Sequence, residues 1–123
     1  MNEYKDLLGT RYVPHGRCKD DGFDCYGLVI EVLKRNGITI PDLYYESLKP
    51  TAEFVKEFDE YTVKINQPEK NCLVEIYSLG NPGHIAVYIG DGLIIHTMLR
   101  SGVVIEPVSH YKHKIRGYYR VKN

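Results

Sequence analysis

Residues 22–30, GFDCYGLVI, are the stretch from which the fold can be predicted. They predict a loop that runs directly into a helix with a cysteine in its first turn. Gly22 permits a bend, and the Asp24 carboxylate is suited to cap the free N–H groups of a helix. Asn36-Gly37 predicts the end of the helix, because glycine adopts the left-handed conformation common there. The apolar residues after Asp24 recur at the spacing of one helical face. They are Cys25, Leu28, Val29, Val32 and Leu33.

The position of Cys25 has two interpretations. The positive end of the helix dipole and the unpaired N–H groups favour a thiolate, which is the nucleophilic form of cysteine. However, Cys25 belongs to the apolar face, and cysteine often acts as a small buried hydrophobic residue. This stretch alone leaves both interpretations open.

Length and composition set the class of protein. A chain of 123 residues is long enough for one domain, which we expect to span 1–123. Its content of 43% hydrophobic and 26% charged residues is typical of a folded soluble protein. A net charge of zero gives no electrostatic reason to expect nucleic acid or an anionic membrane as a partner.

The N-terminal sequence and the number of cysteines indicate the cellular compartment in which the protein is made. No apolar run approaches the roughly 20 residues of a membrane-spanning helix. Residues 1–6, MNEYKD, are charged and form no apolar signal segment, so we expect no signal peptide and synthesis in the cytoplasm. The chain has three cysteines, an odd number, so a disulfide framework is not expected.

The remaining pattern predicts helices first and strands afterwards. Residues 3–8 are expected to form a short helix ending at Gly9, and Ala52 to Tyr61 a second helix. The second half holds short β-branched or aromatic runs, most of them separated by Gly or Pro. These are Leu73 to Leu79, His84 to Ile89, Leu93 to Thr97, Val103 to Glu106 and Ile115 to Val121. This order predicts an α+β domain with an antiparallel sheet.

Two histidines flank one predicted hairpin. If residues 90–92, GDG, form a three-residue loop, Ala86 pairs with His96, and His84 becomes a diagonal neighbour of His96 on one face, roughly 7–8 Å away. A two-residue loop would put the two histidines on opposite faces. A Cys–His enzyme needs one imidazole to take the thiol proton and a second polar group to orient that imidazole.

Two other interpretations of these residues stay open. Each histidine is also explained as a hydrogen-bonded polar residue on a half-exposed strand. Cys25, His84 and His96 together have the ligand types of a zinc site, although no closely spaced pair such as Cys-x-x-Cys accompanies them.

Taken together, these motifs resemble the NlpC/P60 family, the papain-like cysteine peptidases of bacterial cell walls. The resemblance rests on GTRY at 9–12, DCYGLV at 24–29, HIAVYIG at 84–90 and IIH at 94–96. The order of cysteine, histidine and a polar third residue matches the family. The resemblance implies a papain-like α+β fold, with the cysteine-bearing helix packed on an antiparallel sheet.

The resemblance also implies a role for each matching residue. Cys25 is the nucleophile, His84 the general base and acid, and His96 the residue that orients His84. Tyr12 lines the site beside the thiol and helps to hold the substrate or oxyanion. Asp24 matches a family aspartate and is assigned to the same substrate or oxyanion site. The family needs no metal or cofactor for this chemistry.

The family cleaves amide bonds in peptidoglycan stem peptides, typically between D-γ-glutamyl and a diamino acid. This chain departs from it in having Tyr26 in place of serine, Ala86 in place of glycine, and a loop at 14–23 without the usual Trp-Gly-Gly character. The DCYGLV form most resembles members encoded by phages and prophages and associated with tails. The expected partners are therefore a peptidoglycan stem peptide and phage tail proteins, in the virion tail or at the cell wall.

Two alternative functions stay open. One is a structural phage-tail component that binds wall peptide or a tail partner with little turnover. The other is an antibacterial effector, an amidase or deamidase acting on proteins with the same catalytic residues.

Overall fold

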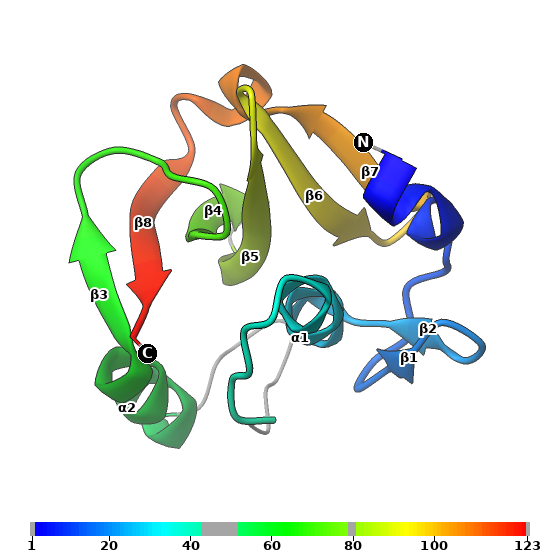
Figure 1. Cartoon of the computed structure of the whole chain (residues 1–123), viewed down its shortest axis with the longest axis horizontal. Coiled ribbons are helices and arrows are strands. Elements are labelled where there is room, and N and C mark those ends of the chain that lie inside the picture. The colour runs from blue at the N-terminus through cyan, green and yellow to red at the C-terminus, as the bar shows by residue number, and fades with distance from the viewer. Residues whose placement is uncertain (1, 43–51, 79–80, 123) are drawn as a thin grey trace.

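The computed structural model describes residues 2–42, 52–78 and 81–122 (Figure 1). The N-terminal half contains η1 (Asn2–Leu7), β1 (Arg17–Cys18), β2 (Gly22–Phe23), α1 (Cys25–Arg35) and α2 (Ala52–Tyr61). The second half contains β3 (Thr62–Ile65), β4 (Leu73–Ser78), β5 (Asn81–Gly90), β6 (Leu93–Met98), β7 (Gly102–Pro107), η2 (Val108–Tyr111) and β8 (Ile115–Val121). The predicted α+β class is confirmed.

The main sheet is antiparallel throughout. Within the described residues it has six strands in the order β3-β8-β4-β5-β6-β7. Five of these strands are predicted from the sequence pattern. The exception is β3, a short edge strand that directly follows α2 and pairs with β8. Leu79, the predicted end of β4, lies outside the described residues. The short β1–β2 hairpin lies apart from the main sheet, in the loop before α1.

Helix α1 is positioned by its caps and its apolar face. Gly37 has φ 77°, and its N–H bonds to Lys34 O at 3.1 Å while Ile38 N–H bonds to Leu33 O at 2.9 Å. These two bonds form the glycine-terminated helix end that the sequence predicts. All five residues of the predicted apolar face are buried, and α1 packs against β5 and β6 (Figure 1).

The β5–β6 hairpin has the predicted register but a different turn. Val87 lies opposite Ile95 and Tyr88 opposite Ile94, as the three-residue loop requires. The turn itself has two residues, Asp91 and Gly92, with Gly90 paired to Leu93. A one-residue register shift between Tyr88 and Gly90 compensates for the shorter turn. The bulge therefore keeps the two histidines on one face, where a plain two-residue loop would have separated them.

Alternating residues of β5 and β6 pack into two apolar cores. Ile85, Val87 and Ile95 belong to the core that includes the buried face of α1. Ala86 and Ile94 belong to a second core on the opposite face, which Tyr111 of η2 helps to cover. The alternation of side chains along each strand accounts for this division.

Candidate active site

The start of α1 is built around a buried carboxylate. Asp24 is the N-cap, with extended backbone (φ −87°, ψ −179°), and its Oδ1 accepts a bond of 2.7 Å from Gly27 N. Its Oδ2 accepts from His15 N at 3.1 Å. The Asp24 side chain is fully buried, and Cys25, the first residue of the helix, is 3% exposed. The predicted cap is confirmed, and it fixes the backbone next to the thiol.

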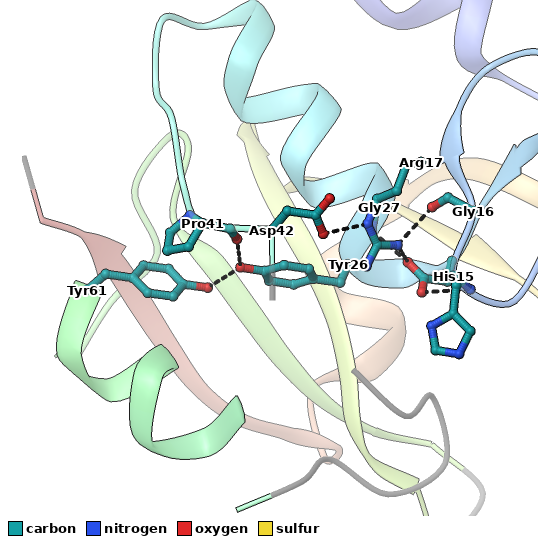
Figure 2. A network of polar contacts seen from close by, with 9 residues as sticks. His15, Gly16, Arg17, Tyr26, Gly27, Pro41, Asp42 and Tyr61 are labelled. Carbon is teal, nitrogen blue, oxygen red and sulfur yellow. Dashed lines mark hydrogen bonds and ion pairs between the residues drawn. The ribbon is translucent and has the colours of Figure 1, made fainter. Parts of the chain in front are cut away.

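Arg17 compensates the charge of that carboxylate. Its Nη1 lies 2.8 Å from Asp24 Oδ1, and its Nε lies 2.8 Å from Asp42 Oδ1 (Figure 2). The same Nη1 donates to Gly16 O at 2.9 Å. Arg17 thereby joins the loop before α1 to the helix start and to the segment after the helix. A buried carboxylate beside Cys25 would disfavour a thiolate, and the guanidinium offsets that effect.

Tyr26 joins the same helix start to α2. Its hydroxyl donates to Pro41 O at 2.6 Å and lies 2.7 Å from the Tyr61 hydroxyl (Figure 2). Burial raises the pKa of Tyr26 to about 12, so the group stays neutral. Tyr26 thus contributes to packing at the position where the family resemblance leads one to expect serine.

Gly27 is required by a close backbone approach. A Cβ at this position would overlap the carbonyl oxygen of Gly16. This contact, together with Asp24, presses the 14–23 loop against the first turn of α1.

The two histidines are in direct contact. His84 Nε2 lies 2.8 Å from His96 Nδ1, with ring centroids 5.1 Å apart. His96 is fully buried and His84 is half-buried. Burial, followed by the charge of His96, lowers the pKa of His84 to about 3. Burial also lowers the pKa of His96, although the hydrogen bond and charge of Glu106 oppose it. Both imidazoles are therefore neutral at neutral pH.

Glu106 and Tyr111 extend the histidine pair, and neither was predicted from the sequence as a site residue. His96 Nε2 lies 2.6 Å from Glu106 Oε2, and the Tyr111 hydroxyl donates to the same oxygen at 2.7 Å. Glu106 lies opposite Ile94 on the neighbouring strand, which makes it a diagonal neighbour of His96. The alternation of β7 would have indicated this only with the β6–β7 register already known.

The remaining predicted residues lie near the helix start. Tyr12 forms an isolated bridge with Phe23, the residue before Asp24, and is half-buried. Cys25 lies on α1, which packs against the strands that carry His84 and His96. A contact between the Cys25 sulfur and His84 remains a prediction, as does a role for Tyr12 and Asp24 toward substrate. The burial of Asp24 favours its capping role.

The described residues contain neither a cluster of metal-binding side chains nor a membrane-spanning helix. In the described part of the chain, no group of three or more His, Cys, Asp and Glu side chains could hold a metal ion. Over the same residues, no helix has the length and apolar character needed to cross a membrane. No disulfide joins any of the three cysteines.

The family model for NlpC/P60 matches residues 9–120. This chain belongs to the NlpC/P60 family. A curated relative, the gamma-DL-glutamyl hydrolase of Bacillus subtilis (strain 168), is 32% identical over 118 residues, covering 85% of this chain and 24% of the relative. The murein DD-endopeptidase MepS/murein LD-carboxypeptidase of Escherichia coli (strain K12) is 27% identical over 111 residues, covering 89% of this chain and 53% of the relative. This NlpC/P60 chain therefore spans about a quarter to a half of these relatives' lengths.

The fold agrees with solved NlpC/P60 domains. The NlpC/p60 domain of the peptidoglycan hydrolase SagA superposes with a TM-score of 0.67 at 23% identity, covering 98% of this chain and 94% of that one. The papain-like NlpC/P60 fold expected from the motifs is thus confirmed.

Proposed function

We propose that this NlpC/P60 protein is a cysteine peptidase or amidase that cleaves peptide bonds of peptidoglycan. The observation that carries the proposal is the 2.8 Å contact between His84 Nε2 and His96 Nδ1. A family member with a thiol at a helix start and an oriented, neutral imidazole has the parts needed for nucleophilic attack. Residues 1–123 are proposed to form one catalytic domain.

The proposed reaction proceeds through a thioester. His84 takes the proton of the Cys25 thiol, and the thiolate attacks the carbonyl carbon of the scissile amide. His84 then gives that proton to the leaving amine, which departs and leaves the acyl group on Cys25. Water attacks the thioester with His84 as base, releasing the carboxylic acid and restoring the thiol. N–H groups at the start of α1 and the Tyr12 side chain are proposed to stabilise the oxyanion.

The proposed bond is the link between D-γ-glutamyl and a diamino acid in the stem peptide. One relative is named a gamma-DL-glutamyl hydrolase and another a murein endopeptidase, which supports this substrate class. Incubation with purified muropeptides, followed by mass spectrometry, tests the proposal, with Cys25→Ala as the control. New fragments with a free γ-glutamyl carboxylate are expected. Intact muropeptides after prolonged incubation with the folded protein would contradict it.

We also propose a phage- or prophage-encoded, tail-associated setting, with synthesis in the cytoplasm and action at the cell wall. Its support is the DCYGLV form of the cysteine motif. Co-purification of the protein with phage tails or tail proteins tests this setting, and its absence from purified virions that encode it would contradict it.

A further inference from the structure

Four side chains from four successive elements form one hydrogen-bonded chain. His84 on β5 contacts His96 on β6 at 2.8 Å, His96 contacts Glu106 on β7 at 2.6 Å, and Tyr111 on η2 contacts Glu106 at 2.7 Å. The Tyr111 ring also meets the His96 ring edge-on, with centroids 5.4 Å apart. The proposed catalytic histidine is thus one end of a chain that reaches Glu106 and Tyr111.

The chemistry of these groups fixes the direction of each hydrogen bond. An ionised carboxylate only accepts, so both the Tyr111 hydroxyl and His96 Nε2 must donate to Glu106. Burial alone would raise the pKa of Glu106, but the hydrogen bonds from Tyr111 and His96 outweigh it and hold that pKa below its usual value. Glu106 is therefore ionised at neutral pH.

The proton on His96 then determines the proton on His84. A neutral imidazole carries one N–H, and on His96 it sits at Nε2, so His96 Nδ1 has a lone pair. Because that lone pair faces His84 Nε2, the latter must carry the hydrogen. The opposite assignment would set the lone pair of His96 Nε2 against the carboxylate. This tautomer is assigned from the donors and acceptors along the chain.

We propose that Glu106 is a positioning residue that sets the tautomers of both histidines and leaves the lone pair of His84 on Nδ1, the nitrogen that takes the thiol proton. The inference rests on the proposed function for its catalytic meaning, while the tautomer itself is a property of the folded protein. When His84 becomes positively charged during the reaction, the negative charge of Glu106 acts on it through His96.

One neighbouring residue provides a matched control. His110 Nδ1 lies 3.7 Å from the other carboxylate oxygen of Glu106, and its side chain is 58% exposed. It approaches the same carboxylate but lies outside the chain that leads to His84. His110→Gln is therefore expected to leave the tautomers and the rate unchanged.

The experiment combines ring-nitrogen NMR with kinetics. In ¹⁵N-histidine-labelled wild type at neutral pH, His84 is expected to carry its hydrogen on Nε2 and its lone pair on Nδ1. In Glu106→Gln, whose amide can also donate, the ring nitrogens are expected to report mixed tautomers. The kcat for muropeptide cleavage is expected to fall about 10- to 100-fold, less than the roughly 10²- to 10⁴-fold contribution of a proton-transfer group itself, because Glu106 acts only through His96. KM is expected to stay within about twofold.

The two proposals fail in different ways. A His84 lone pair on Nε2 in the wild type, or unchanged ring-nitrogen signals and kcat in a folded Glu106→Gln protein, overturns the role of Glu106. A wild type that carries the assigned tautomers but cleaves no muropeptide overturns the proposed function and leaves the tautomer assignment supported.

Discussion

The cysteine side and the histidine side of the site are held by different kinds of contact. Around Cys25, a buried carboxylate, a guanidinium and close backbone contacts fix the start of one helix. Around His84, hydrogen bonds run across three strands through two neutral rings to Glu106. The first arrangement holds the backbone of the helix start in place, whereas the second determines which ring nitrogens of the histidines carry hydrogen. Apart from Cys25 itself, which supplies the reacting sulfur, changes on the cysteine side are therefore expected to alter mainly stability, and changes on the histidine side mainly pH dependence and rate.

The largest effect is expected where the cysteine side provides the reacting atom. Cys25→Ala removes the proposed nucleophile, and muropeptide cleavage is expected to fall at least about 10³-fold. The fold is expected to survive, with a loss of about 1–3 kcal/mol in the free energy of unfolding for one small buried side chain. Mass-spectrometric rates and urea unfolding measure the two effects. Cleavage within tenfold of wild type would contradict the role of Cys25.

On the histidine side, loss of the His84 ring is expected to lower kcat more than loss of the His96 ring. His84→Ala removes the base and is expected to lower kcat about 10²- to 10⁴-fold. His96→Ala is expected to cost less, since an orienting group is partly replaceable by water. Single-turnover rates of the two variants test this order. The distinction between base and orienting residue fails if His96→Ala is the slower enzyme.

On the cysteine side, Asp24→Ala is expected to affect stability strongly. It removes a buried acceptor of bonds from Gly27 N, His15 N and Arg17. A loss of about 2–4 kcal/mol is expected, from the missing cap and from the loss of the buried partner of the Arg17 guanidinium, which keeps only the exposed Asp42. Asp42→Ala is the matched control, because Asp42 binds the same arginine but is 63% exposed.

The control is expected to cost less than about 1 kcal/mol, as for other surface ion pairs. Urea midpoints of the two variants measure the difference. Equal losses would mean that the buried cap contributes no more than the exposed pair.

A smaller effect is expected in stability against pH. Folding lowers the pKa of His84 to about 3, while the unfolded chain binds that proton near the ordinary value of about 6.5. Between these values the unfolded state holds more protons, so stability is full above about pH 6.5 and falls as pH drops toward 3. Urea unfolding at pH 7 and pH 5 is expected to show a larger loss for wild type than for His84→Gln. Equal losses would contradict burial of a neutral His84.

The same contrast explains what the sequence could predict. The Asp24 cap, the α1 face and the Gly37 end depend on neighbours within a few turns, so spacing predicted them. The facing of His84 and His96 was also predictable, although a bulge at Gly90 rather than a longer loop produces it. Glu106, Tyr111 and Arg17 gain their roles through strand register and loop packing. Glu106 is one of 16 acidic residues, and its neighbours in the sequence do not indicate the strand register that places it beside His96.

The most direct test of the central claim, that Cys25 and His84 act as one unit, is the rate of Cys25 alkylation by iodoacetamide against pH. Cys18 and Cys72 are replaced so that only Cys25 reacts. Because neutral His84 takes the thiol proton as the sulfur reacts, the wild type is expected to alkylate rapidly well below the ordinary thiol pKa of about 8.5. Without that base, His84→Ala is expected to shift the profile toward higher pH, without fully reaching that value because the helix start still favours the thiolate. An unperturbed wild-type profile that His84→Ala leaves unchanged would contradict the claim.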